Sequence, residues 1–356
     1  MILQILKTSL NQKTIMCMNS DNMIKDIWKE LEEAHVPSVV KRAIDIPSCL
    51  KMFCTYKEDG YYGIAFSFSE GINLDISPFQ NLSEIEVSLF KDSSFPDSKF
   101  LLIQLVNRDC RVRDIFAAIC GNIANTIQSV SSEREAVLLV VSQMRKWQDL
   151  FSKKMKTTLS VQEQQGLFGE LSFFQKLICS SMDKVHAVKS WVGPNMNPQD
   201  FQSELWAVEV KTITANKFPN VLINSELQLD ESTISKLYLY NMVVEILPVD
   251  GKTLPGLIDE LRDILSQETY AANLFENKLL YSGYFDTDKD VYKERHYYIR
   301  KENYYLVQGE FPRIKKENLL LGVSDVKYSI SLAVPTENIV EESNVLNTIL
   351  SYEGNQ

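Results

Sequence analysis

The sequence predicts an α/β protein: a mixed central sheet flanked by helices, preceded by a β-rich α+β region and followed by an α+β extension. Three observations support this prediction. Short apolar runs separated by turn residues fill residues 43–106, as in strands. Two capped amphipathic helix patterns follow within residues 132–179. An apolar hairpin and a further strand come next, within residues 200–247. We therefore divide the chain into residues 1–130, 131–250 and 251–356, and expect the second part to form the core.

The length and composition fit a folded protein of two or three domains, because 45% of the 356 residues are hydrophobic. Lysine and arginine total 37 against 47 acidic residues, a net charge of −10. A chain this acidic is not a general nucleic-acid coat, since nonspecific binding depends on neutralising phosphates with basic side chains. If it acts on DNA, it needs a local basic surface, a metal ion or a partner.

Cysteine and histidine usage argues against a zinc site. The six cysteines fall singly along the chain, and there are three histidines. Scattered cysteines fit reduced thiols in the cytosol. No stretch reaches the roughly 20 apolar residues of a membrane span, and the first residues lack a signal-peptide core. We therefore expect a cytoplasmic protein without a membrane partner.

Residues 1–130 are expected to form an accessory or recognition domain. A helix is predicted through Ile24, Trp28 and Leu31, which share one face. Strands are predicted at 61–68, 85–90 and 100–105, followed by a helix over 114–127. No combination of residues typical of catalysis occurs in this part of the sequence.

Two capping boxes mark the next helices. Ser132 with Glu135 begins a helix that extends through the lysines at its end, and Ser160 with Glu163 begins a helix that continues toward Cys179. The lysines of the first helix either interact with its macrodipole or touch phosphate. They are Lys153, Lys154 and Lys156.

Glu170 lies on the apolar stripe of the second of these helices. It shares that face with Leu167, Phe174 and Leu177. A carboxyl group beside an apolar face needs a partner, so Glu170 either belongs to a site or lies at the solvated rim of the stripe. A strand over 185–191 is predicted to follow and to lead into the hairpin.

The hairpin between Asp200 and Thr212 holds the candidate site. Its second strand has an apolar face and a face that carries Glu209 and Lys211. A four-residue turn would place Asp200 directly opposite Glu209, with Cβ atoms roughly 4.5–5.5 Å apart. The residues expected on the apolar face are Trp206, Val208 and Val210.

These residue types suit a magnesium ion. Mg²⁺ takes hard oxygen ligands and is usually held by one or two carboxylates, with water and substrate phosphate completing the octahedron. Asp200 and Glu209 are the candidate ligands, together with the carbonyl of Val210. Lys211 can orient a water molecule or stabilise negative charge on a phosphate under attack. The alternative is an exposed strand face with a surface salt bridge.

The order Pro198, Asp200, Glu209 and Lys211 resembles the PD-(D/E)XK nuclease motif of the restriction-endonuclease-like fold, with Gln199 inserted after the proline. Three further segments extend the resemblance to PD-(D/E)XK-motif proteins encoded in bacterial restriction and anti-phage operons. These are residues 166–171, 190–194 and 311–313. The resemblance implies a restriction-endonuclease-like core, with Glu170 in the place of a helix glutamate that faces the metal. It also implies partners such as a helicase-like ATPase and a methyltransferase.

An acid, any residue and then lysine is by itself a weak signal. The same triplet occurs at residues 97–99, 276–278 and 325–327. Only residues 200–211 combine an acid, a turn, an apolar strand and the acid-x-lysine triplet in order. Strands over 220–223 and 237–247 follow. In the loop between them, Gln228 either positions a phosphate or water or makes a loop hydrogen bond.

The last part of the chain contains a predicted helix over 255–277 and one aromatic and basic region over 292–316. Basic residues among aromatic residues can follow a phosphate backbone and stack on bases, and a β-hairpin with ordinary tyrosines is the alternative. The candidate DNA contacts are Lys293, Arg295, Arg300, Lys301, Arg313 and Lys315.

The sequence hypothesis is a Mg²⁺-dependent endodeoxyribonuclease, with Mn²⁺ as a substitute, that serves as the cleavage subunit of a bacterial restriction or phage-defence system. The alternative is a catalytically silent DNA-binding or assembly subunit of the same fold, and either protein could form a homo-oligomer. There is no Walker-type glycine loop and no GxGxxG, and three histidines make a histidine-based hydrolase site hard to assemble.

Overall fold

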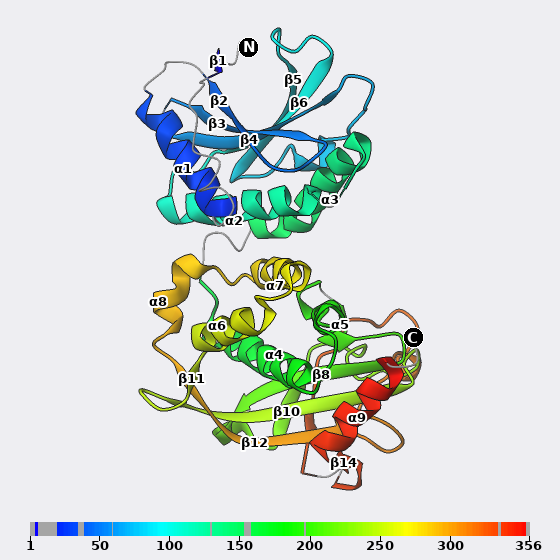
Figure 1. Ribbon diagram of the computed structural model, residues 1–356. Coiled ribbons are helices and arrows are strands. Elements are labelled where there is room, and N and C mark those ends of the chain that lie inside the picture. Colours follow the sequence, from blue (N-terminus) through cyan, green and yellow to red (C-terminus); the bar gives the residue numbers. More distant parts are fainter. Residues whose placement is uncertain are drawn as a thin grey trace. The chain divides into compact units, whose positions relative to one another are not determined.

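The structure is a computed structural model that describes residues 4–5, 20–34, 39–58, 60–128, 130–152, 158–195, 197–333 and 336–353. It forms two compact units, Met1–Thr158 and Leu159–Gln356 (Figure 1). The predicted division at residue 130 therefore differs from the structural one, because the helix after residue 132 belongs to the first unit. Across the described residues, no helix has the length and apolar character needed to cross a membrane.

The first unit contains a sheet with the strand order β1-β2-β3-β4-β6-β5. Its strands are β1 (Gln4–Ile5), β2 (Val40–Ile44), β3 (Lys51–Lys57), β4 (Tyr61–Ser69), β5 (Ile85–Lys91) and β6 (Ser98–Leu105). Neighbouring strands are antiparallel, except for the parallel pair β1 and β2. The three strands predicted in this region are confirmed as β4, β5 and β6.

Helices pack beside this sheet on one side (Figure 1). They are α1 (Ser20–Glu33), α2 (Cys110–Ile127) and α3 (Glu133–Ser152). Trp28 of α1 stacks on Phe116 of α2 with ring centroids 5.7 Å apart, and its indole donates to the carbonyl of Gly63, 2.9 Å away. Helix α2 begins earlier than predicted, because the Asp109 side chain caps it. The lysines 153, 154 and 156 lie outside the described residues.

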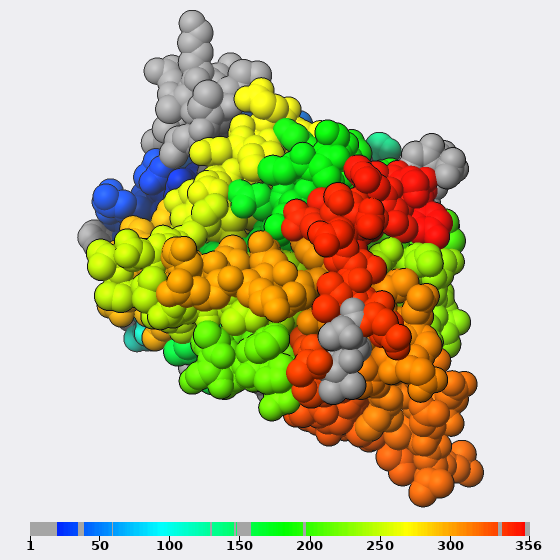
Figure 2. All heavy atoms as spheres, turned by 90° about the horizontal axis from the view of Figure 1, so that it is seen from below, coloured from blue at the N-terminus to red at the C-terminus, as the bar shows by residue number. Residues whose placement is uncertain are grey.

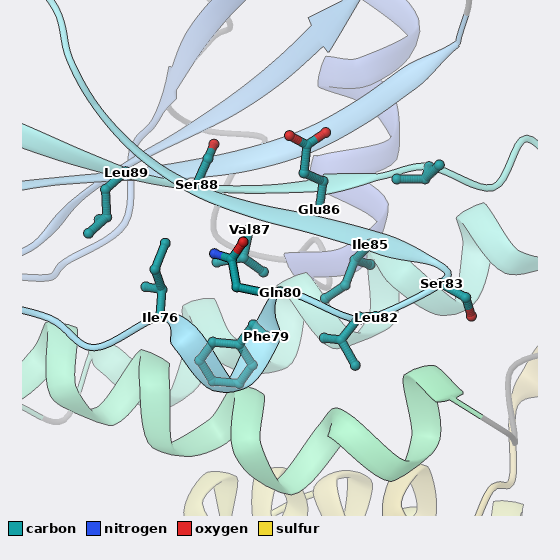
Figure 3. A pocket seen from close by; sticks show the side chains of 11 residues that line it. Ile76, Phe79, Gln80, Leu82, Ser83, Ile85, Glu86, Val87, Ser88 and Leu89 are labelled. Carbon is teal, nitrogen blue, oxygen red and sulfur yellow. The ribbon is translucent and has the colours of Figure 1, made fainter.

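A groove runs beside β5, between that strand and the short helix η2 (Ser77–Phe79) (Figure 3). Its lining combines apolar residues, among them Ile76, Phe79 and Val87, with the polar residues Gln80, Ser83, Glu86 and Ser88. Within the described lining, Glu86 is the one side chain that titrates as an acid or base. The groove therefore lacks the cluster of ionisable groups that acid-base or metal chemistry requires.

The second unit contains the mixed sheet that the sequence predicts, with the strand order β11-β12-β10-β8-β7. Its strands are β7 (Phe201–Gln202), β8 (Trp206–Thr214), β10 (Lys236–Leu247), β11 (Lys252–Thr253), β12 (His296–Leu306) and β14 (Ile339–Val340), which pairs with β12. Strands β8 and β10 are parallel, and the other pairs are antiparallel. Strands β9 (Asn220–Ile223) and β13 (Tyr328–Ser331) form a separate antiparallel pair.

The two faces of this sheet belong to two apolar clusters. One contains Trp206, Val208 and Val210, and the other contains Ala207. The alternation predicted for this strand is therefore confirmed. Helices α4 (Val161–Cys179), α6 (Leu254–Leu265), α7 (Thr269–Tyr281) and α9 (Glu342–Glu353) contribute to the first cluster. Helix α9, red in the space-filling view, lies across the surface of this unit (Figure 2).

Two predicted elements are wrong. Residues 185–191 were expected to be a strand, but Lys184–Ser190 is the helix α5, because Asp183 caps it by accepting a hydrogen bond from the His186 N–H, 2.9 Å away. The single helix expected over 255–277 is divided into α6 and α7. The buried positions Leu257, Leu261 and Leu265 of α6 lie four residues apart, and a new series of buried positions begins in α7 at Ala271. The two series do not continue one helical face, so one straight helix could not bury both sets of residues.

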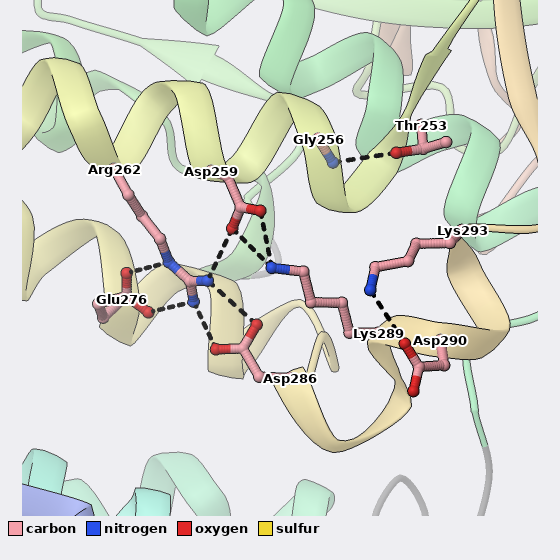
Figure 4. Close-up of polar contacts among 9 residues, drawn as sticks. All are labelled: Thr253, Gly256, Asp259, Arg262, Glu276, Asp286, Lys289, Asp290 and Lys293. Carbon is pink, nitrogen blue, oxygen red and sulfur yellow. Dashed lines mark hydrogen bonds and ion pairs between the residues drawn. The ribbon is translucent and has the colours of Figure 1, made fainter.

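Arg262 joins the helices after β11 (Figure 4). Its guanidinium donates to both oxygens of Glu276, 2.7 and 2.8 Å away, and to both oxygens of Asp286, 3.0 and 2.9 Å away. Lys289 of α8 (Lys289–Tyr292) bonds Asp259 of α6. The bidentate contacts of Arg262 fix α6 and α7 against each other. Both helices contribute to the apolar cluster on one face of the mixed sheet.

Strand β12 lies inside the mixed sheet, between β11 and β10. Residues after 251 therefore contribute strands to the same sheet as the hairpin. Four of the five tyrosines in the aromatic and basic region are buried, and Tyr298 is 43% exposed. The buried ones are Tyr292, Tyr297, Tyr304 and Tyr305. These four rings belong to the core and are not available to stack on bases.

Candidate active site

The hairpin register places Asp200 where the sequence predicts it. Phe201 pairs with Val208, and Gln202 pairs with Ala207. Continuing this register by one residue puts Asp200 opposite Glu209. The side chain of Asp200 also contacts β8 directly, since its Oδ2 accepts a hydrogen bond from the N–H of Val210, 2.8 Å away.

Glu209 and Lys211 lie on the same face of β8 and contact each other. The ammonium nitrogen of Lys211 is 2.8 Å from Oε1 of Glu209, and their side chains are 12% and 1% exposed. The second carboxylate oxygen of Glu209 is buried and has no hydrogen-bond partner among the residues that the structure describes. Gln228 accepts from Lys211 at 3.1 Å and from the N–H of Asn224 at 2.8 Å. Gln228 therefore positions Lys211 as well as its own loop.

Glu170 of α4 reaches the site through Trp191. The indole N–H of Trp191 donates to Oε2 of Glu170, 2.8 Å away. The next two N–H groups, of Val192 and Gly193, donate to the main-chain oxygen of Asp200 at 2.8 and 2.9 Å. The segment after α5 thus contacts Glu170 with a side chain and Asp200 with its backbone.

Gly193, at the start of the short helix η4 (Gly193–Asn195), shows how close the two acids are. A Cβ atom added to Gly193 would lie 3.0 Å from Oδ1 of Asp200 and 3.1 Å from Oε2 of Glu170. Two carboxylate oxygens from different elements therefore face one small space, which a side chain at position 193 would fill.

Burial raises the pKa values of all three acids, and repulsion from a neighbouring carboxylate adds to the shift at Glu170 and Glu209. Burial, and then the charge of Asp200, raises the pKa of Glu170 to about 8. Burial raises the pKa of Asp200 to about 6, although Lys211 and the Val210 N–H oppose the shift. Burial and the charge of Asp200 also raise the pKa of Glu209 well above its usual range. A cation that bound these carboxyl groups would therefore compete with protons.

Lys211 is the one cation in this group of four side chains. Burial opposes its charged form, but the carboxylates of Glu209 and Asp200 raise its pKa. Three carboxyl groups therefore face a single ammonium group. Such a site keeps an excess of negative charge once the acids are ionised, and a divalent cation can neutralise it.

The fit to a divalent cation rests on two features of these residues. The unpartnered Oε2 of Glu209 is a free hard oxygen, and Oδ1 of Asp200 faces the space at Gly193. Within the described ranges, no group of three or more His, Cys, Asp or Glu side chains is placed so that it could hold a metal ion. Mg²⁺ does not need such a group, because one or two carboxylates with water and phosphate usually suffice.

The candidate DNA contacts already have partners in the protein. Arg295 donates to Gln164, and Lys293 pairs with Asp290. Arg300 bonds Glu245 and lies over the Tyr298 ring, with 4.6 Å between the guanidinium carbon and the ring centroid. Three more candidates remain. Lys301 lies over the Phe218 ring, while Arg313 and Lys315 both contact Glu231. Arg300 and Lys293 are about half exposed, whereas the Arg313 side chain is 5% exposed.

Sequence reasoning assigned no role to several residues that support the site. Buried Gln199, inserted in the motif, donates to the carbonyl of Leu227 at 2.8 Å and so fixes the loop that carries Gln228. Trp191 lies in one of the segments that carry the family resemblance and at the end of the strand expected over 185–191. Lys278 of α7 donates to the carbonyl of Trp191. The insertion itself could have indicated Gln199, but no local pattern indicates Lys278.

Comparison with known proteins identifies the family of this chain. Residues 24–333 match the family model described as "Putative PD-(D/E)XK family member, (DUF4420)". No curated protein and no solved structure matches the chain. The match spans both units and includes Glu170, Asp200, Glu209 and Lys211, and so the chain belongs to this PD-(D/E)XK family.

Proposed function

We propose that this protein is a metal-dependent endodeoxyribonuclease that hydrolyses phosphodiester bonds, with Asp200, Glu209, Lys211 and Glu170 as its active site. The observation that carries the proposal is the meeting of these side chains from α4, β8 and the chain before β7. Glu209 and Lys211 are in contact. The charges of the neighbouring side chains in this group also shift the pKa values of Glu170, Asp200 and Glu209.

Asp200 and Glu209 would hold a Mg²⁺ ion, with Mn²⁺ as a substitute, and the carbonyl of Val210 would be a third protein oxygen. When bound, the ion would lower the pKa of a water molecule and neutralise charge on the phosphate. Oε2 of Glu209 is suited to this role because it has no other partner. Oδ1 of Asp200 is suited because Oδ2 already bonds the Val210 N–H.

Lys211 would orient the attacking water and stabilise negative charge on the phosphate. Its ammonium group is held at both Glu209 and Gln228, so it needs little reorganisation during the reaction. Glu170 would complete the acidic site from the helix side, where Trp191 fixes its carboxylate. Gln228 would position Lys211, not the substrate itself.

DNA binding would depend on local positive charge and on partners, because the chain as a whole has a net charge of −10. Of the basic residues considered, Lys293, Arg300 and Lys301 are exposed, and partly buried Arg295 and Lys315 are secondary candidates. The resemblance noted in the sequence favours a cleavage subunit of a bacterial restriction or phage-defence system. Its partners would then be a helicase-like ATPase and a methyltransferase.

The test is cleavage of supercoiled plasmid with Mg²⁺ or Mn²⁺, beside single-stranded DNA and RNA of the same sequence. Glu209→Ala and Lys211→Ala are expected to abolish cleavage. Glu204→Gln changes an exposed acid of the same hairpin and is expected to retain it. Activity that survives both site substitutions rules out this site.

A catalytically silent DNA-binding or assembly subunit is the second candidate, favoured by the net negative charge of the chain. It predicts DNA or partner binding that is indifferent to Glu209→Ala and no divalent ion between the two acids. Crystals soaked in Mn²⁺ separate the two candidates, because anomalous scattering locates the ion directly.

A further inference from the structure

Lys278 is a buried lysine whose ammonium group bonds only main-chain oxygens in the described part of the chain. It is 8% exposed. Its nitrogen donates to the carbonyl of Lys189, 3.1 Å away, and to the carbonyl of Trp191. No described carboxylate forms an ion pair with it, and burial lowers the pKa of Lys278 to about 7. A buried cation without a counter-ion is costly, so packing alone would favour an apolar side chain here.

The two carbonyls that Lys278 binds belong to the end of α5 and the residue that follows it. That segment contacts two acids of the proposed site. Its Trp191 indole bonds Glu170, and its Val192 and Gly193 N–H groups bond the backbone of Asp200. Helix α7 also holds the Trp191 ring, since Phe275 lies with its ring centroid 6.0 Å from that of Trp191.

One peptide group links Lys278 to Asp200. The carbonyl of Trp191 accepts from Lys278, and the N–H of the same peptide, at Val192, donates to Asp200 at 2.8 Å. Hydrogen bonds in such a chain polarise one another, so a cation on the carbonyl strengthens the N–H as a donor. The ammonium group is therefore linked to the main-chain oxygen of Asp200 through one peptide group, and it holds the backbone of the residue whose indole bonds Glu170.

We propose that Lys278 is a positioning residue for the acidic site, which sets the segment Trp191–Gly193 so that Glu170 and Asp200 face the same space. The effect that Lys278 is expected to have on metal binding rests on the proposed nuclease function. The structural part, that Lys278 fixes the Trp191–Glu170 contact, stands independently of activity.

The first test measures Mn²⁺ affinity by calorimetry and plasmid cleavage for Lys278→Met and Lys278→Arg. Lys278→Met is expected to weaken Mn²⁺ binding by about 10–100-fold, as loss of a residue that orients a metal ligand typically does. Lys278→Arg keeps the positive charge. On a logarithmic scale, it is expected to recover at least half of the Mn²⁺ affinity that Lys278→Met loses. Lys252→Met removes a surface lysine that pairs with Glu260 and serves as the matched control.

The second test does not need activity. The protein is labelled with 5-fluorotryptophan, and Trp191→Phe assigns the Trp191 fluorine resonance. Glu170→Gln is expected to shift this resonance in the wild-type background and to shift it by less than half as much in the Lys278→Met background. If Lys278→Met does not fold, Lys278→Gln, which keeps a donor but removes the charge, carries the same comparison.

The inference is overturned if Glu170→Gln shifts the Trp191 resonance equally in both backgrounds, or if Lys278→Met retains Mn²⁺ affinity within about twofold of wild type. Lys278 would then only cap the end of α5. A wild-type protein that neither binds Mn²⁺ nor cleaves nucleic acid overturns the proposed function instead, and the fluorine comparison still decides the role of Lys278.

Discussion

The ammonium nitrogen of Lys211 lies 2.8 Å from Oε1 of Glu209, whereas Oε2 of the same carboxylate is buried without a partner in the described part of the chain. One oxygen of Glu209 is therefore committed to the lysine and the other is free for a cation. The two residues should consequently have separable effects, because Glu209 would bind the metal and Lys211 would act on the substrate.

Lys211→Met is predicted to reduce turnover by at least about 100-fold, the loss typical of removing one preorganised electrostatic group. Its Mn²⁺ affinity at pH 8.5 should be unchanged or higher, because a cation that competes with the metal is gone. Glu209→Gln should weaken Mn²⁺ binding by at least about tenfold. Calorimetry and single-turnover cleavage measure the two effects separately. Equal loss of Mn²⁺ affinity in both variants would contradict this division of roles.

Proton release should accompany metal binding. The pKa values of Glu170, Asp200 and Glu209 are all raised, chiefly by burial, so the free site holds protons that a cation must displace. Mn²⁺ affinity is therefore predicted to increase as the pH rises from 5.5 toward 8.5, with proton uptake by the buffer. Calorimetry in two buffers of different ionisation enthalpy counts the protons. An affinity that is flat across this range would show that the acids are already ionised.

The same raised pKa values predict a stability effect without metal. The folded protein keeps a proton on Glu170 that the unfolded chain releases, so stability falls as the pH rises from the ordinary carboxyl range through about 8. Glu170→Gln removes the part of this dependence that Glu170 causes, and its amide oxygen can still accept from Trp191. Its melting temperature should exceed that of wild type by a few degrees at pH 8.5 and match it near pH 5. A lower melting temperature at pH 8.5 would contradict the predicted repulsion.

Arg313 is predicted to stabilise the fold more than it binds DNA. Its guanidinium contacts both oxygens of Glu231, at 3.0 and 2.5 Å, and bonds from Arg313 and Lys315 lower the pKa of Glu231 to about 2 against the opposing effect of burial. Arg313→Met should reduce the free energy of unfolding by roughly 1.5–3 kcal/mol. Because the folded pKa of Glu231 is lowered, this stabilisation is present above the ordinary carboxyl range and is lost as the pH falls toward 2.

Denaturant unfolding at pH 7 and pH 3 tests this effect, and the difference between wild type and Arg313→Met should shrink at the lower pH. Lys316→Met changes a neighbouring exposed lysine and should leave stability unchanged. If Arg313→Met keeps full stability and loses only DNA affinity, the ion pair is not structural and Arg313 is a DNA contact.

Local patterns predicted those parts of the site that lie on regular elements. The two-residue period of β8 and the apolar positions around it specify one register, since a slip of one residue would turn Glu209 into the opposite face. The capping box at Ser160 likewise fixed the start of α4, where both reciprocal hydrogen bonds are present. Local signals of this kind were enough to predict where Asp200, Glu209 and Lys211 lie in the hairpin, and to predict the helix that carries Glu170.

Short elements and distant contacts were not predictable in the same way. Helix α5 has seven residues, and Val185 and Val188 favour a strand unless the Asp183 cap is recognised. The bond from Lys278 to Trp191 joins residues 87 positions apart, and no period or motif relates them. The tyrosines around β12 suggested a surface for stacking, but their place inside the sheet depends on pairing with β10, which only the fold determines.

Gly169 and Gly166 of α4 provide a matched pair for the packing of the helix against β8. A Cβ added to Gly169 would lie 1.7 Å from Oγ1 of Thr212, whereas nothing lies within 4 Å of one added to Gly166. Gly169→Ala must therefore displace Thr212 or move α4 away from β8, the two elements that carry Glu170 and Glu209. Gly166→Ala only removes backbone freedom from the helix.

Gly169→Ala is predicted to cost roughly 1–3 kcal/mol of stability, as overpacking of a core typically does, and to weaken Mn²⁺ binding. Gly166→Ala is predicted to gain roughly 0.5–1 kcal/mol through helix propensity and to leave Mn²⁺ affinity unchanged. Thr212→Ala in the Gly169→Ala background removes the clashing oxygen and should recover at least half of the lost stability. Denaturant unfolding and calorimetry measure these changes. Equal stability of the two alanine variants would contradict the close packing of α4 against β8 that places an added Cβ at Gly169 only 1.7 Å from Oγ1 of Thr212.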